Sequence, residues 1–371
     1  MTIKLLLQLI FGVFSFKRKN MRGFNTRRIL MSFILLPVFT IQLLLNNLFL
    51  LLDYVFFPNF LNQKIKSPVF IIAAPRSATT YLFHTLAASD HYTYFKLWEI
   101  IFAPSICQKY MALIVLKLDR FIGSPLKKII LFTENQLIGK LKKIHLIGLN
   151  LPEEDEAVLL WSLSSFYLNF FYPDSNFFDD LVLFDQRISE ARKTRIMKSY
   201  ERYVKRHNFV FNKKNEKHYL SKNPLMMAKV KSLAFIYPDA VILNINRSPS
   251  KTLPSTLELN AKLYSLFTSV SVSKELNEKS TRIVIEWYKM AERYLNEYYP
   301  NNHLKIDFLK LIKHNEDEQD RISAFLNLPP SVFKREVEQD THHKSENNYK
   351  ELDSKQLKLV LQEIPFMADY S

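Results

Sequence analysis

The pattern of apolar and polar positions is most regular between residues 69 and 86. Val69 to Ala73 form a continuous apolar run, which is typical of a strand buried on both of its faces. Pro75 then marks a turn, and Leu82 and Leu86 follow with the spacing of one helix face. The pattern therefore predicts a strand, a tight loop and a helix, in that order.

A second unit of the same kind lies further along the chain. The end of a strand, a helix and another strand are predicted over residues 218–224, 225–237 and 240–246. Such a unit indicates parallel strands, whose carboxyl ends meet at one edge of the sheet, where ligands gather. We therefore expect an α/β fold with a central parallel sheet flanked by helices, and with Pro75, Lys222 and Arg247 at the same edge.

The amino-terminal part has a different pattern. Ile29 to Leu52 contains no charged residue and is long enough to be a transmembrane helix. On a helical wheel its polar residues and their neighbours fall within an arc of about 160°; they are Arg28, Ser32, Thr40, Gln42, Asn46, Asn47 and Asp53. Pro37 is a point at which the helix can break into two.

Three arrangements of this segment follow from the pattern. It can span the membrane, with the basic cluster before it keeping the amino terminus in the cytoplasm. It can lie in the interface as a monotopic anchor, which the mixed face and Pro37 favour. It can also simply pack on the rest of the chain.

Charge supports a membrane partner. The net charge is +15, and residues 1–66 hold nine basic side chains against one acidic side chain. This excess of positive charge lies on both sides of an apolar segment, and no base-reading motif accompanies it. We therefore expect an anionic membrane surface as partner and no nucleic acid. The single Cys107 excludes an internal disulfide and a cysteine metal cluster.

The loop after the first strand carries phosphate-binding chemistry. Ser77, Thr79 and Thr80 place hydroxyl and N–H groups at a helix start, where the partial positive charge suits phosphate, and Arg76 adds a cationic fork. The sequence G-x-x-x-x-G-K-[ST] of nucleoside triphosphatases is absent from the chain. A simple capped turn is the alternative interpretation of this stretch.

Residues 74–80, Ala-Pro-Arg-Ser-Ala-Thr-Thr, resemble the 5′-phosphosulfate loop (P-R-S-G-T-T) of sulfotransferases that use 3′-phosphoadenosine-5′-phosphosulfate (PAPS). The chain has Ala78 where the family has Gly, which matters only if the backbone needs a positive φ or a close approach. Arg247 and Ser255, eight residues apart, resemble the 3′-phosphate motif of the same family, with Ser248 in place of the usual Asp.

The resemblance covers roughly residues 66–370 and implies a P-loop-like three-layer fold. It also implies that PAPS is held by Pro75, Arg76, Ser77, Ala78, Thr79, Thr80, Arg247 and Ser255. Lys222 and Arg76 would neutralise charge on the bridging and leaving oxygens, and no metal is needed. The segment from His342 to Tyr349 resembles the part of the family that folds over the donor.

Two acidic stretches complete the candidate site. Glu99 stands alone among apolar residues, and partial burial would raise its pKa toward the range of a general base; a solvated or ion-paired carboxylate is the alternative. The resemblance implies that Glu99 takes the acceptor's proton. Residues 152–156, Pro-Glu-Glu-Asp-Glu, resemble a family element near the acceptor, which makes Glu154 and Asp155 candidate substrate contacts.

These observations predict a membrane-associating segment, residues 1–65, and a catalytic domain, residues 66–371. The expected reaction is sulfuryl transfer from PAPS to a hydroxyl, or less favourably an amine, of a small-molecule or lipid acceptor. A non-catalytic nucleotide-binding protein and a phosphotransferase are the alternatives. Monotopic attachment predicts the cytoplasmic face of a bacterial-type membrane, whereas a spanning helix predicts a Golgi-like type II protein. The oligomeric state is not predicted.

Overall fold

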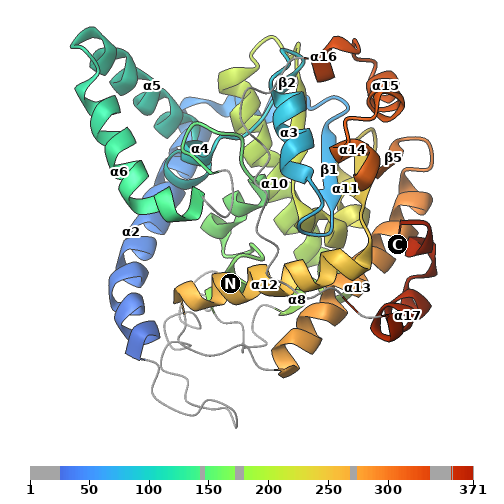
Figure 1. Cartoon of the computed structure of the whole chain (residues 1–371). Coiled ribbons are helices and arrows are strands. Elements are labelled where there is room, and N and C mark those ends of the chain that lie inside the picture. Colours follow the sequence, from blue (N-terminus) through green and yellow to red (C-terminus); the bar gives the residue numbers. More distant parts are fainter. Residues whose placement is uncertain are drawn as a thin grey trace.

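A computed structural model gives the fold for residues 26–142, 147–171, 179–267, 274–334, 352 and 354–370. Its centre is a parallel five-stranded sheet in the order β2-β3-β1-β4-β5, with helices on both faces (Figure 1). The strands are β1 (Val69–Ala73), β2 (Tyr92–Thr93), β3 (His218–Lys222), β4 (Val241–Asn246) and β5 (His303–Asp307). The predicted α/β class is confirmed; the short edge strand β2 was not predicted.

Strand β1 is buried along its whole length, and its side chains alternate between two cores. Phe70 and Ile72 belong to the larger core, whereas Val69, Ile71 and Ala73 belong to the smaller one on the opposite face. Since successive side chains of a strand point to opposite faces, one apolar run fills both layers. The continuous run in the sequence is thus explained by a central strand.

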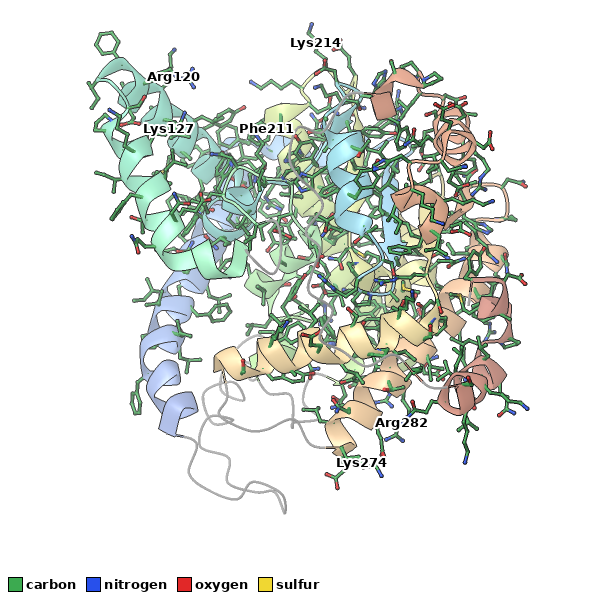
Figure 2. All side chains as sticks on the ribbon, in the orientation of Figure 1. Arg120, Lys127, Phe211, Lys214, Lys274 and Arg282 are labelled. Carbon is green, nitrogen blue, oxygen red and sulfur yellow. The ribbon has the colours of Figure 1, made fainter. Side chains whose placement is uncertain are left out.

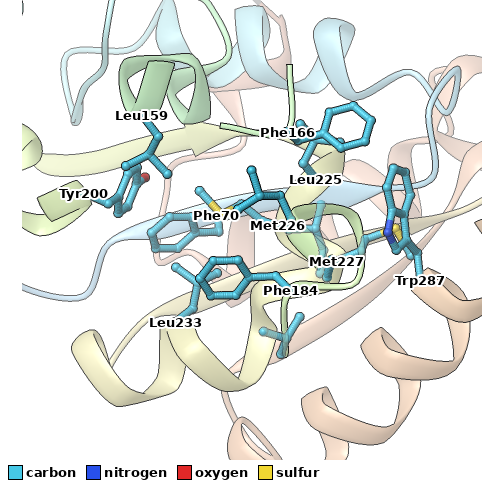
Figure 3. Close-up of a cluster of buried hydrophobic side chains, with 14 of the residues drawn as sticks. Phe70, Leu159, Phe166, Phe184, Tyr200, Leu225, Met226, Met227, Leu233 and Trp287 are labelled. Carbon is cyan, nitrogen blue, oxygen red and sulfur yellow. The ribbon is translucent and has the colours of Figure 1, made fainter. Parts of the chain in front are cut away.

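The larger core lies between the sheet and the helices α10 (Glu190–Phe211), α11 (Val230–Ile236) and α13 (Lys274–Tyr298). Figure 3 shows Phe70 of the sheet packed among side chains that include Tyr200, Leu233 and Trp287. The aromatic residues Phe166 and Phe184 are buried in the same cluster. The smaller core is closed by α3 (Thr79–Ala87), α14 (Phe308–Ile312), α15 (Glu316–Phe325) and α16 (Ser331–Lys334).

The remaining helical elements connect or cover these layers. They are α2 (Thr26–Phe56), η1 (Pro58–Asn62), α4 (Leu97–Phe102), α5 (Ile106–Phe121), α6 (Pro125–Lys142), η2 (Asp155–Ser162), α7 (Leu168–Phe171), α8 (Asp179–Val182), α9 (Phe184–Arg187), η3 (Pro224–Lys229), α12 (Pro249–Phe267), α17 (Ser354–Glu363) and η4 (Pro365–Tyr370).

Helix α10 differs from its expected character. The basic sequence over residues 193–217 predicts a solvated helix and loop, yet one face of α10 is buried and includes Arg206 and His207. Both side chains have acidic partners far away in the sequence, Asp53 and Glu99 respectively. The buried face of α10 could not be predicted from the sequence, because it contains basic residues, which are usually exposed. The positions of basic residues along a helix do not show which of them have a buried acidic partner.

Helix α2 is one continuous helix of 31 residues that contains Pro37, so the break considered at Pro37 does not occur. Leu35 to Phe56 is long and apolar enough to cross a membrane by length and composition. Its polar side chains, however, bind the domain. Gln42 donates to the carbonyl of Ile101 at 3.4 Å, and Asn47 donates to the carbonyl of Trp161 at 3.0 Å.

The opposite face of α2 is apolar and exposed. Val38, Ile41, Leu44, Leu48 and Leu51 all have more than half of their surface accessible. The predicted amphipathic pattern of α2 is therefore present. Its polar face packs against the domain and its apolar face is exposed, which is the reverse of the usual arrangement in a soluble protein. Figure 1 shows α2 along one side of the molecule, beside α5 and α6.

Candidate active site

The loop between β1 and α3 has an unusual backbone. Arg76 and Ala78 both have positive φ values, 68° and 57°, and Ala78 is the residue that precedes the helix. Ser77, between them, is fully buried. The condition under which the replacement of glycine by Ala78 matters, a positive φ, is thus met, since a Cβ is disfavoured in this conformation.

We expect Ala78→Gly to stabilise the protein by about 0.5–1 kcal/mol, because relief of the left-handed strain exceeds the greater unfolded-state entropy of glycine. The midpoint temperature of thermal unfolding should rise by roughly 1–2 °C. The matched control is Ala87→Gly at the end of α3, where the same change should destabilise by up to about 1 kcal/mol. Equal shifts for both variants would show that the conformation of residue 78 carries no strain.

The second candidate loop follows β4 and meets the first one. Arg247 donates to the carbonyl oxygen of Arg76, and Nε of Arg76 lies 3.4 Å from Oγ of Ser255 on α12. The guanidinium of Arg247 also lies over the ring of Phe308, 4.4 Å from its centroid. Because β1 and β4 are parallel neighbours with Ala73 opposite Ile245, the sheet itself brings the two loops together.

Ser248, which departs from the family's Asp, serves the start of α12. Its hydroxyl lies 2.7 Å from that of Ser250 and accepts from the backbone N–H of Ser250 at 3.3 Å. A serine hydroxyl is suited to such a position at a helix start. The substitution is therefore compatible with the local structure.

Pro254 within α12 links this loop to the carboxyl-terminal part of the chain. Proline has no N–H, so the carbonyl four residues earlier, on Ser250, loses its helical partner. That carbonyl accepts from the backbone N–H of Leu352 at 3.2 Å instead. Leu352 thus lies against the helix that follows Arg247, whereas the predicted covering segment from His342 to Tyr349 is outside the described residues.

Lys222 occupies the end of β3 on the same edge. Its position is set by the pairing of β3 with β1, in which Lys222 lies opposite Ile71. The lysine is 2% exposed, and its Nζ lies 2.7 Å from Oε1 of Glu154. The other oxygen of Glu154 accepts from the hydroxyl of Tyr167. The predicted clustering of Pro75, Lys222 and Arg247 at one sheet edge is therefore confirmed.

Two buried acidic residues anchor the chain after Glu154. Asp155 accepts from Tyr200 and Tyr219, each at 2.5 Å, and from Ser221 at 2.9 Å. Burial raises the pKa of Asp155, although these hydroxyls oppose the shift. Asp155 is 1% exposed and holds the segment to β3. The acceptor contact expected for it stays a prediction.

Glu156 makes the next anchor. It is fully buried and pairs with Lys229, while its oxygens also accept from the Ser165 hydroxyl at 2.7 Å and the Phe166 N–H at 3.1 Å. Together with Asp155, it fixes the backbone on the carboxyl side of Glu154. The carboxylate of Glu154 is the more accessible of the three, with 18% of its side chain exposed.

Glu99 has an environment unlike the predicted one. It is 1% exposed, and its Oε2 lies 2.8 Å from Nδ1 of His207 and 3.8 Å from Nζ of Lys109. Burial alone would raise its pKa, but His207, Lys109 and the backbone N–H of Lys96 together lower the pKa below the usual value. The expected raised pKa is therefore wrong. The same burial lowers the pKa of Lys109 to about 8.

The partners of Glu99 come from other parts of the chain. His207 lies on α10 and bridges Glu99 to the hydroxyl of Thr93, 2.7 Å from Nε2. These residues are far apart in the sequence and share no motif, so the sequence contains no signal from which the pairing could have been predicted. The catalytic role of Glu99 stays a prediction, because none of these contacts joins it to the edge formed by Arg76, Lys222 and Arg247.

The residues at the sheet edge suit a bound phosphosulfate group. Within the described part of the chain, the buried hydroxyl of Ser77 has no hydrogen-bond partner, and Ala78 has no side-chain group with which to cap α3. An oxyanion would satisfy both the hydroxyl and the free N–H groups at that helix start. Among the same residues, no three His, Cys, Asp or Glu side chains are grouped to hold a metal ion.

Known proteins resemble this chain in sequence and in fold. A family model described as "Sulfotransferase family" matches residues 68–331. No protein in the curated set matches. Sulfotransferase STF9 from Mycobacterium avium has a TM-score of 0.71 at 14% identity, covering 91% of this chain and 85% of its own. Sulfotransferase STF1 from Mycobacterium tuberculosis H37Rv has a TM-score of 0.66 at 15% identity, covering 98% and 90%.

Proposed function

Because the chain belongs to the sulfotransferase family, we propose that it transfers a sulfuryl group from PAPS to the hydroxyl of a membrane-associated acceptor. One observation carries the proposal. The ends of three neighbouring strands bring Arg76, Lys222 and Arg247 to a single edge of the sheet, and α12 adds Ser255, 3.4 Å from Arg76.

Each part of this edge has a role in the proposal. Ser77, Thr79, Thr80 and the amides around Ala78 bind the 5′ end of the donor, which the positive end of α3 favours. Arg247 and Ser255 bind the 3′-phosphate, which distinguishes this donor from ATP. Lys222 and Arg76 stabilise the negative charge that develops on the bridging and leaving oxygens.

The reaction forms a bond between the acceptor oxygen and sulfur and breaks the bond between sulfur and the 5′-phosphate oxygen. The acceptor proton goes to a carboxylate. Glu154 is the better placed candidate, since it contacts Lys222 directly and is partly open, whereas Glu99 is enclosed by His207 and Lys109. A general base must lie within reach of the proton that it removes, so the position of the carboxylate is a stronger criterion than its pKa.

Support for an apolar acceptor comes from the aromatic side chains next to this pair. The hydroxyl of Tyr167 donates to Glu154, and the ring of Phe170 lies 6.0 Å from the ring of Tyr167, centroid to centroid. The ring of Tyr264 also contacts Phe170, with ring centroids 5.9 Å apart. These rings, together with the exposed apolar face of α2, favour a lipid or another membrane-associated molecule over a polar metabolite.

The donor is tested by thermal unfolding of the detergent-solubilised protein with 3′,5′-bisphosphoadenosine, ATP or AMP. Binding to the native state alone stabilises it by about 2.7 kcal/mol at a hundredfold excess over Kd. We expect the largest shift with the bisphosphate and its loss in Arg247→Ala. The matched control, Arg293→Ala, removes a guanidinium from a side chain that is 75% exposed, and should keep the shift.

An equal shift with ATP, or none with the bisphosphate, would contradict PAPS as donor. Binding of the bisphosphate without transfer to any acceptor would favour the alternative of a non-catalytic nucleotide-binding protein. That alternative is suggested by the departures at Ala78 and Ser248.

A further inference from the structure

The helices α5 and α6 form a hairpin whose tip is apolar and exposed. Phe121 at the end of α5 is 91% exposed and Ile122, in the turn, is 69% exposed. Along the two helices, further large apolar side chains face solvent; they include Met111, Ile114, Val115, Leu118, Ile129 and Phe132. Exposed apolar side chains that recur at helical spacing indicate a binding surface, since a soluble helix normally turns that face inward.

Cationic side chains surround the same tip. Lys117, Arg120, Lys127 and Lys128 are all exposed, and Figure 2 shows Arg120 and Lys127 on the part of the hairpin that projects from the body of the molecule. The one carboxylate near the tip, Asp119 in the last turn of α5, is only 5% exposed. The accessible charge at the tip is therefore positive.

Asp119 also makes the tip rigid. Its carboxylate accepts from the backbone N–H groups of Leu126 and Lys127, at 2.7 and 3.0 Å, and so caps the start of α6. Its carbonyl accepts from the N–H of Ser124 at 2.7 Å. A turn whose backbone is already ordered presents Phe121 and Ile122 at a smaller entropic cost on binding.

We propose that the α5–α6 hairpin is a membrane-binding element that inserts Phe121 and Ile122 into the interface of an anionic lipid bilayer. Lys117, Arg120, Lys127 and Lys128 then contact the headgroups, as basic residues next to inserted apolar side chains do. Helix α2 packs against α5, and its exposed apolar face lies in the same interface. This arrangement gives the chain two points of attachment that lie far apart in the sequence.

Charge favours lipid over a second copy of this chain as the occupant. A twofold contact between two tips would bring eight exposed cations together, and like charges across an interface are unfavourable. An anionic bilayer neutralises the same cations. The apolar tip and its basic border therefore match a lipid surface better than they match each other.

The test places a polarity-sensitive fluorophore on Phe121→Cys in a Cys107→Ser background of the full chain. The matched control is Phe235→Cys in the same background, since Phe235 on α11 is 66% exposed. Vesicles are made of phosphatidylcholine alone or with phosphatidylglycerol, and a second set contains brominated lipid. On anionic vesicles we expect a blue shift and quenching by brominated lipid at position 121 and neither effect at position 235.

The charge contribution is measured with Lys127→Gln/Lys128→Gln, which should lower partitioning onto anionic vesicles on the order of tenfold. The control pair, Lys355→Gln/Lys358→Gln on α17, should leave it unchanged. The proposal is overturned if the protein floats with vesicles while the label at position 121 stays in water. It is also overturned if that label becomes shielded without vesicles as protein concentration rises, because a second copy then covers the tip.

Discussion

Glu154→Gln is expected to lower kcat by about 10²–10⁴-fold, the usual contribution of a positioned general base. It should also lower stability, because the side chain of Lys222 is 2% exposed and loses its counter-charge. The side chain of Glu154 is 18% exposed, and glutamine keeps an oxygen within reach of Lys222 and Tyr167. Turnover with PAPS and an acceptor found by screening, measured together with chemical denaturation, separates the two effects. Product formation under saturating donor distinguishes slow chemistry from weak binding.

Glu99→Gln is the matched variant, and for it we expect a loss of stability without a comparable loss of turnover. Its carboxylate is buried with Lys109, whose side chain has no exposed surface. Neutralising one member leaves a buried cation without its counter-charge, which costs about 3–5 kcal/mol. The folded fraction, assayed at low temperature, should retain most of its turnover.

The two variants also decide between the candidate bases. If Glu99→Gln abolishes turnover in a protein that remains folded, while Glu154→Gln stays active, then Glu99 is the base that the family resemblance implies. In that case Glu154 serves only to hold Lys222.

Arg206→Ala is expected to lower the free energy of unfolding by about 3–5 kcal/mol, because it leaves a buried carboxylate unpaired. Asp53 on α2 has no exposed surface. Its carboxylate accepts from Nε of Arg206 at 2.7 Å and from the N–H groups of Ile106 and Cys107, each at 3.0 Å. One acidic residue thus joins α2 to both α5 and α10.

The measurement is denaturant-induced unfolding of the detergent-solubilised full chain. Lys205→Ala, next to Arg206, is the matched control: it breaks an i,i+4 pair with Glu201 whose side chains are 20% and 26% exposed, so a loss below about 1 kcal/mol is expected. Equal, small effects of both substitutions would indicate that α2 is not docked on the domain. Such a result would favour a spanning helix over the monotopic arrangement.

Local pattern was sufficient for much of the fold. An apolar run, a turn at Pro75 and helical spacing after it predicted β1, the loop and α3, because burial on both faces requires a continuous run. The βαβ pattern placed Lys222 and Arg247 at the edge that carries Arg76, because parallel strands end on the same side of a sheet. The residues of the proposed phosphate-binding loop were also visible in the sequence, since they are neighbours along the chain.

Other elements could be located only imprecisely. Helix α15 begins at Glu316, because Asn315 accepts from the N–H of Glu318 and caps the helix. The two-residue strand β2 has no pattern of its own; it exists because Thr93 and Tyr92 pair with β3. A short element that depends on its neighbour leaves no periodic signal in the sequence.

The sequence by itself thus determined the strand-loop-helix unit, the βαβ unit, the residues of the loop after β1 and the amphipathic character of α2. Only the tertiary structure decided which carboxylate lies beside Lys222, which way the polar face of α2 turns and how the pKa of Glu99 shifts. The physical reason is that desolvation and charge pairing depend on neighbours brought in by folding. His207 lies 108 residues from Glu99 and Lys222 lies 68 residues from Glu154, and no local pattern records such contacts.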